Sequence, residues 1–310
     1  MLYRAVGELS GAVPAGVLVL AGPTASGKTD LAIELAARFD AEIVGADSRQ
    51  IYRGMPIGTA APSTEQLHAV PHHLIGFLDP HERYSAARFS ADATRAIKEI
   101  HGRGKRALVA GGTGFYIRAL TGAVELAPQY DEAMRERLAH EAKVHEPQFL
   151  YDWLTVRDPR RAQMLHPGDA YRVLRALEVA LAPAQALLRD EPLRTLASEG
   201  IPFLKVALEI DRAQLDERIE RRTQAMLERG LLEEAERIGT GAVAASAVGY
   251  PQALAYLQGR CTLAELRTLL ARATRRYARR QETWFRGEPQ MEWAHASDVE
   301  RLAREKLGWV

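Results

Sequence analysis

The sequence predicts an α/β fold in which helices flank a parallel sheet and an all-helical domain is inserted into the chain. Three observations indicate it. Short apolar runs alternate with helical patterns in the first third, a helical stretch without strand patterns follows, and a strand pattern returns near residue 203. Apolar runs that lack polar alternation are typical of parallel strands covered on both faces. A chain of 310 residues has the length of about two domains.

Each element has a local signal in the sequence. The apolar runs predict strands at 17–21, 41–46, 106–112 and 203–210. Helical periodicity predicts helices at 28–39, 85–102, 212–238, 248–258 and 262–285, followed by a short tail. From 130 to 198, charged helical runs are broken only by prolines. We therefore expect a core of residues 1–124 and 200–310 around a helical insertion at 125–199, with residues 1–15 as a loose leader.

Composition narrows the class of protein. The chain is 47% hydrophobic and 26% charged, and its net charge of +1 predicts no global field that would attract nucleic acid. The single cysteine, Cys261, excludes an internal disulfide and a cysteine-based zinc cluster, and it fits a reducing cytoplasm. The apolar run GVLVLAG at 16–22 is too short to span a membrane. We expect a cytoplasmic protein that makes no membrane contact.

The stretch GPTASGKT at 22–29 fits the pattern G-x-x-x-x-G-K-[ST], follows an apolar strand and opens a helix. Such a loop places backbone N–H groups around phosphates and makes the predicted core P-loop NTPase-like. Lys28 would neutralise phosphate oxygens, and Thr29 would ligate Mg²⁺. The predicted phosphate-binding residues are Gly22, Pro23, Thr24, Ala25, Ser26, Gly27, Lys28 and Thr29. The motif alone does not identify which phosphate compound binds.

Two further strand ends carry polar residues. Asp47 and Ser48 follow the second strand, at the edge where open α/β sheets bind ligands. Asp47 alone could equally cap a turn. The strand at 106–112 runs into Gly111-Gly112-Thr113, without the acidic residue that usually holds Mg²⁺ and water in P-loop NTPases. This argues against ordinary ATP hydrolysis, although Asp47 could serve as a kinase's acid.

The last informative stretch is basic and aromatic. Arg272, Arg275, Arg276 and Arg279 recur at helical spacing and therefore share one face, which Arg280 and Arg286 extend. Tyr277 and Trp284 interleave with them, a pattern that suits a phosphate backbone and unstacked bases. A solvated helix face is the alternative. The histidines at 68, 72, 73 and 81 lack metal-ligand spacing and are expected to pack in loops or lie at the surface.

Taken in order, eight segments resemble one family. They are GPTASGKT, DSRQIYRGMPIGTA, VPHHLIGFLDP, YSAARF, AGGTGFYIRAL, HPGDAYRVLRALEV, VGY and RRQETWFRG. The chain closely resembles bacterial tRNA dimethylallyltransferases, also called tRNA isopentenyltransferases, from about residue 17 to 287. The resemblance implies that the loop holds dimethylallyl diphosphate with Mg²⁺. It also implies transfer of the dimethylallyl group to N6 of the adenosine 3′-adjacent to the anticodon, tRNA position 37.

The resemblance also implies residue roles. Asp47 would accept the N6 proton, because an exocyclic adenine amine is a poor nucleophile. Lys28, Thr113 and Arg222 would stabilise the leaving diphosphate, and the target base would be flipped out of the anticodon loop. The helical insertion would help to grip the anticodon stem-loop.

The resemblance further implies a set of residues that contact tRNA. They are Asp47, Ser48, Arg49, Gln50, Thr113, Arg135, Tyr171, Arg172, Val173, Leu174, Arg175, Ser246, Ala247, Val248, Gly249, Tyr250, Pro251, Arg279, Arg280, Gln281, Glu282, Thr283, Trp284, Phe285 and Arg286. Ala61, Gly168 and Pro251 depart from the family's usual Lys, Asn and basic residue. Two other readings stay open at this point, a P-loop small-molecule kinase and a non-catalytic tRNA-binding protein. We expect a monomer.

Overall fold

The computed structural model describes residues 16–124, 126, 132–182 and 193–310. The chain divides into two compact units, one formed by Met1–Val124 with Leu193–Val310 and the other by Glu125–Pro192. The expected leader at 1–15 lies outside the described residues. In the part of the chain that is described, no helix combines the length and the hydropathy needed to cross a bilayer.

The first unit contains a six-stranded, all-parallel sheet in the order β3-β2-β4-β1-β5-β6. The strands are β1 (Val17–Ala21), β2 (Ala41–Gly45), β3 (His72–His73), β4 (Arg106–Gly111), β5 (Phe203–Leu208) and β6 (Met291–Ala294). Central β1 pairs Leu18 with Leu108 of β4 and with Leu204 of β5. Because β4 lies between β1 and β2, the carboxyl ends of these three strands are neighbours. Such a crossover point is where open α/β sheets bind ligands.

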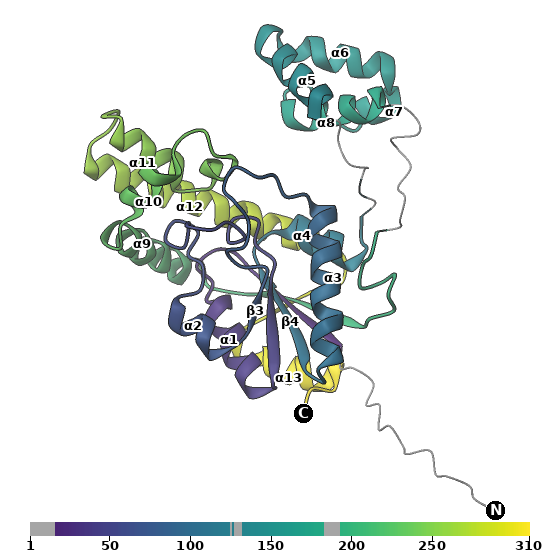
Figure 1. Ribbon diagram of the computed structural model, residues 1–310, viewed down its shortest axis with the longest axis vertical. Helices are drawn as coiled ribbons and strands as arrows, with labels where there is room; N and C mark the ends of the chain where they lie inside the picture. The colour runs from purple at the N-terminus through teal and green to yellow at the C-terminus, as the bar shows by residue number, and fades with distance from the viewer. Residues whose placement is uncertain (1–15, 125, 127–131, 183–192) are drawn as a thin grey trace, which may run out of the picture. The chain divides into compact units, whose positions relative to one another are not determined.

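Helices cover both faces of this sheet. The helices of the first unit are α1 (Lys28–Arg38), α2 (Thr64–Ala69), α3 (Ala86–Gly102), α4 (Gly114–Thr121), α9 (Arg212–Glu228), α10 (Leu231–Ile238), α11 (Tyr250–Leu257), α12 (Leu263–Arg286) and α13 (Ala296–Leu307), with a short 3₁₀ helix at Val243–Ser246. α1 and α13 pack in one core cluster with β1 and β5, where Phe39 meets Trp309 edge to face. Figure 1 shows α3 along the sheet and α9 to α12 as a further helical group beyond it. α12 contacts both α4 and α9 and so joins that group to the sheet.

The strands predicted at 17–21, 41–46, 106–112 and 203–210 are present, each within two residues of its expected end. The single helix expected at 212–238 is two helices, because Gly230 adopts φ 97° and ends α9 before α10 begins. The tail holds β6 and α13, and the sheet also includes the two-residue β3. Neither strand was predicted, because both are short and complete the sheet's edges through pairing rather than through a strong apolar run.

The second unit is helical in its described part. It contains α5 (Glu132–Val144), α6 (Pro147–Arg157), α7 (Pro159–Ala162) and α8 (Ala170–Leu181) around an apolar cluster of its own. The sequence placed the end of the insertion at residue 199, whereas the compact unit ends at Pro192. Residues 193–199 are held by the first unit. Leu196 donates its N–H to Leu120 O, and the Ser90 hydroxyl donates to Arg194 O at 2.8 Å.

Candidate active site

The phosphate-binding loop connects β1 to α1. Gly27 caps α1 with φ 90°, a left-handed conformation that favours glycine, and no side chain among the described residues caps the amide groups of the helix N-terminus. The Lys28 ammonium donates to Pro23 O at 3.1 Å. The Ser26 hydroxyl is buried and has no hydrogen-bond partner in the described part of the chain. The loop therefore presents donors and a hydroxyl toward the space at the end of β1.

The loop after β2 carries Asp47 next to this space. The Arg49 N–H donates to Asp47 Oδ1 at 2.9 Å, which fixes the carboxylate in a tight turn. The Ser48 N–H donates to the Thr113 hydroxyl at 2.9 Å, and that hydroxyl lies 3.2 Å from Ser48 Oγ. A side chain at Gly111 would place its Cβ 2.1 Å from Ala46 O, so glycine is required where the two strand ends meet. The end of β4 is thus held against the loop that carries Asp47, with the Thr113 hydroxyl bonded to Ser48.

The cationic groups of Lys28 and Arg222 lie near Asp47 and interact with its charge. Burial lowers the pKa of Lys28 to about 8, while the charge of Asp47 raises it and that of Arg222 lowers it. Burial also lowers the pKa of Arg222, and the charge of Asp47 acts against this. The Arg222 guanidinium lies 3.5 Å from Thr59 O, and its Nε is buried without a partner among the described residues. Two cations and one carboxylate therefore share a partly desolvated site.

Two neighbouring cavities open on these groups. The larger, of about 890 Å³, is lined by the loop residues 25–29 and by four arginines of α9 and its C-terminal end, Arg218, Arg221, Arg222 and Arg229. The smaller, of about 170 Å³, is lined mainly by polar and charged residues, among them Lys28, Thr29, Asp47 and Arg222. Its lining also includes the apolar or aromatic residues Met226, Ala247, Val248, Leu270 and Tyr277. The smaller cavity can hold a charged group beside a small hydrocarbon.

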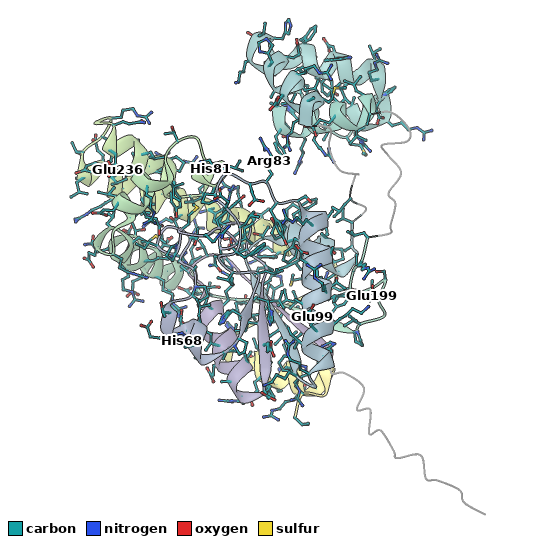
Figure 2. The ribbon with its side chains drawn as sticks, viewed as in Figure 1. His68, His81, Arg83, Glu99, Glu199 and Glu236 are labelled. Atoms are coloured by element: carbon teal, nitrogen blue, oxygen red, sulfur yellow. The ribbon has the colours of Figure 1, made fainter. Side chains whose placement is uncertain are left out.

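The residues present fit a magnesium ion held mainly by a phosphate ligand. Thr29 lines both cavities, and Asp47 lines the smaller one. In the described residues, no group of three or more His, Cys, Asp or Glu side chains could hold a metal. His68 and His81 lie far apart in Figure 2, one on α2 and one in a loop. Mg²⁺ is commonly bound by one or two protein oxygens together with substrate phosphates and water, as this arrangement allows.

The arginines that the sequence placed on one basic face of α12 have different environments in the structure. Arg275 does not present its charge outward, because its guanidinium bonds to Asp216 at 3.1 Å and also contacts Glu220 on α9. Arg275 therefore links α12 to α9 through ion pairs. The prediction that it belongs to a free basic face was wrong. Among the described residues no such ion pair is found for Arg272, Arg276 or Arg279, and all three side chains are exposed. Arg280 lines the smaller cavity and lies over the Tyr277 ring.

Comparison with known proteins identifies the family. Residues 50–288 match the family model described as IPP transferase, and residues 15–76 match the model described as isopentenyl transferase. The chain belongs to the IPP transferase family. It is 42% identical over 301 residues to the tRNA dimethylallyltransferase of Geobacter sulfurreducens, covering 94% of this chain and 97% of that protein. It is 43% identical over 282 residues to tRNA dimethylallyltransferase 2 of Geotalea uraniireducens, covering 89% and 91%.

Solved structures of the IPP transferase family agree with this fold. The tRNA isopentenylpyrophosphate transferase of Bacillus halodurans superposes with a TM-score of 0.67 at 35% identity, covering 95% of this chain and 96% of that one. A eukaryotic dimethylallyltransferase acting on tRNA superposes with a TM-score of 0.72 at 26% identity, covering 94% and 76%. The α/β core with a P-loop is therefore the fold of this family.

The tRNA-contacting positions that the family resemblance implies are not equally available. Arg49 and Gln50 line the smaller cavity, Ser48 and Thr113 are half-buried, and Tyr171 and Arg172 are exposed on α8. Five of the implied side chains are instead buried, and any tRNA contact from them would have to come from the backbone. They are Val173, Ala247, Tyr250, Gln281 and Phe285.

Two implied arginines of the second unit already have a protein partner. Arg175 bonds to the carboxylate of Glu178 at 2.9 Å, and Arg135 lies 3.5 Å from the same carboxylate. Glu178 is itself buried. A tRNA phosphate would therefore have to share these two guanidinium groups with Glu178.

Sequence reasoning also missed several residues of the site. The buried Glu234 carboxylate accepts from the Ile57 and Gly58 N–H groups and from the Tyr250 hydroxyl, and so fixes the loop that carries Thr59. The apolar lining residues Met226 and Leu270 of the smaller cavity were not singled out either. Their only signal was an apolar position at helical spacing, which is the same signal that any core residue gives.

Proposed function

We propose that this protein transfers a dimethylallyl group from dimethylallyl diphosphate to N6 of the adenosine 3′-adjacent to the anticodon of tRNA. The products are N6-dimethylallyladenosine and diphosphate. The observation that supports this most directly is the lining of the smaller cavity, which combines Lys28, Arg222 and Asp47 with apolar and aromatic residues. A donor with a charged diphosphate and a five-carbon chain matches both kinds of lining residue.

The residues divide the reaction between them. The diphosphate lies on the loop amides, Lys28 and Arg222, whose positive charges stabilise it as the bond from carbon to oxygen breaks. The adenine N6 attacks that carbon, and Asp47 takes the proton that N6 loses as the new bond forms. The base reaches the cavity only after leaving the stack of the anticodon loop. Thr29 would hold Mg²⁺, which neutralises charge on the diphosphate.

The ATP-dependent alternative predicts different behaviour. At the end of β4 the chain offers Gly111, Gly112 and Thr113, without the carboxylate expected of an NTP-hydrolysing P-loop protein. We expect the protein to act as a monomer in the cytoplasm, with no significant ATPase or kinase activity. Size-exclusion chromatography with light scattering measures the first of these expectations directly.

One assay tests the proposal. The protein is incubated with Mg²⁺, dimethylallyl diphosphate and unmodified tRNA, and the digested tRNA is examined by mass spectrometry for N6-dimethylallyladenosine. Product formation that requires both substrates supports the proposal. tRNA-independent consumption of ATP would indicate a kinase, and tRNA binding without product would indicate a non-catalytic binding protein.

A further inference from the structure

Gln281, a residue of α12, bonds to both the phosphate-binding loop and the end of β4. Its side chain is only 5% exposed, although it stands between Arg280 and Glu282 in the most basic part of the sequence. Gln281 Oε1 accepts from the Thr24 N–H of the phosphate-binding loop at 2.8 Å. Gln281 Nε2 donates to Gly112 O, at the end of β4, at 2.8 Å. Both ends of one amide are thus used by backbone groups of two different strand-end loops.

The hydrogen bonds of Gln281 lie next to Asp47, the proposed proton acceptor. The position that a Cβ on Gly112 would occupy is 2.2 Å from Gln281 Nε2 and 3.7 Å from Asp47 Oδ2. Only glycine lets the amide approach the end of β4 here. The next residue, Thr113, bonds to the Asp47 loop through Ser48. Gln281 therefore connects the phosphate-binding loop with the end of β4, where Thr113 bonds to the loop that carries Asp47.

We infer that Gln281 is a positioning residue that sets the distance between the donor carbon and the adenine N6. This inference rests on the proposed function, because it needs a donor on the phosphate-binding loop and an acceptor beside Asp47. The reacting atoms must approach to about 3–3.5 Å, and a misplacement of about 1 Å can cost about 100-fold in rate. Breaking the bridge leaves Lys28, Arg222 and Asp47 in place. Each substrate should therefore still bind while turnover falls.

The test separates turnover from binding. Gln281→Met keeps the length of the side chain and removes both hydrogen bonds. Gln281→Glu keeps the acceptor for Thr24 and loses the donor for Gly112. Gly112→Ala disturbs the same bridge from the other side, because its Cβ would overlap Gln281 Nε2. For all three variants we expect kcat to fall about 30- to 100-fold. The Kd of inorganic diphosphate with Mg²⁺ and the Kd of tRNA should stay within about threefold of wild type, since the ligand-binding groups are unchanged.

Ser90→Ala is the matched control. The Ser90 hydroxyl is fully buried and bonds to Ala119 O and Arg194 O, but Ser90 lines neither cavity. Its loss should lower stability comparably and leave kcat unchanged. Wild-type turnover of a Gln281 variant that is folded by circular dichroism would overturn the inference. So would a kcat loss equal to that of Ser90→Ala, or a parallel loss of diphosphate and tRNA binding. If the wild-type protein itself forms no N6-dimethylallyladenosine, the proposed function falls and this inference with it.

Discussion

At the scale of single residues, the candidate site depends on small polar groups held by backbone partners. Asp47 is fixed by the Arg49 N–H, and Thr113 is fixed by the Ser48 N–H. Both side chains sit at strand ends that have little freedom, because Gly111 brings the β4 end against Ala46 O. The chemistry of each residue can therefore be tested by substitutions that keep the local turn.

Asp47→Asn should lower kcat about 100-fold or more, the usual scale for loss of a general base. The asparagine side chain keeps an oxygen that can accept from the Arg49 N–H, so the turn should persist and tRNA should still bind. Single-turnover kinetics and tRNA binding by filter retention measure the two effects. Asp79→Asn is the control, since Asp79 Oδ1 accepts from the His81 N–H at 2.9 Å in the same kind of turn. Near wild-type turnover in Asp47→Asn would remove Asp47 from the mechanism.

If the Thr113 hydroxyl stabilises the leaving group, Thr113→Ala should lower kcat and raise the activation free energy by about 2–3 kcal/mol. Thr113→Ser keeps the hydroxyl and should recover much of the loss. Ser48→Ala distinguishes two roles of that hydroxyl, because it removes only the Ser48 Oγ partner. A loss in Ser48→Ala as large as that in Thr113→Ala would indicate that the hydroxyl acts by holding the Asp47 loop. Equal kinetics in the Ala and Ser variants of Thr113 would exclude any role of the hydroxyl.

At the scale of elements, α12 has three different surfaces. Arg275 faces α9, Gln281 faces the phosphate-binding loop, and Arg272 and Arg279 face solvent. The 24-residue length of the helix lets one element serve these three environments. The exposed arginines are therefore separable by mutation from the structural one.

Replacing Arg276 and Arg279 together with Ala should weaken tRNA binding and lower the slope of log Kd against log salt by about one for each lost phosphate contact. Diphosphate affinity should hardly change. Titrations of tRNA at several salt concentrations measure the slope. Arg275→Ala is the matched control, and we expect it to lower Tm through loss of the contacts with Asp216 and Glu220 while leaving the slope unchanged. An unchanged slope in the double variant would mean that the face is merely solvated.

The Glu42 carboxylate links three elements and gives a pH-dependent test. It is buried on β2 and bonds to His73 on β3 and to Arg103 at the end of α3. Burial alone would raise the pKa of Glu42, but the hydrogen bonds from Arg103 and His73 outweigh it and lower the pKa. A lowered folded-state pKa stabilises the protein above the unfolded pKa, and this stabilisation is lost as pH falls through the folded value.

Glu42→Gln should therefore be destabilised at pH 7, and the difference from wild type should shrink as pH falls below about 4.5. Urea unfolding at pH 7 and at pH 4 measures it. Glu305→Gln, which affects only an exposed pair with Arg301, is the control and should change stability little at either pH. A difference for Glu42→Gln that is constant with pH would contradict the assigned role of the charge.

At the scale of the whole molecule, the chain builds two units with separate cores. The apolar cluster of α5 to α8 is formed within the second unit, and the sheet clusters are formed within the first. Every residue that lines the two cavities belongs to the first unit. The division allows donor binding and the second unit's contribution to be tested independently.

Replacing residues 125–192 with a short flexible linker should leave a first unit that unfolds cooperatively and binds inorganic diphosphate within about threefold of wild type. The reason is that its core and its phosphate-binding groups are complete without the second unit. Apparent tRNA affinity should fall, if the insertion grips the anticodon stem-loop as proposed. Circular dichroism, diphosphate titration and tRNA titration measure the three outcomes. Unchanged tRNA affinity would show that the insertion does not contribute to RNA binding.

The sequence by itself determined the sheet strands β1, β2, β4 and β5, the phosphate-binding loop and the position of Asp47 and Thr113 at strand ends. These features follow from local signals, namely apolar runs and glycine motifs, together with the rule that parallel strands end at one edge. Only the tertiary structure decided that Gln281 is buried between two loops while its neighbour Arg280 lines a cavity, that Arg275 pairs with α9, and that β6 completes the sheet. Helical periodicity assigns a residue to a face, but which element covers that face depends on packing between segments distant in the chain.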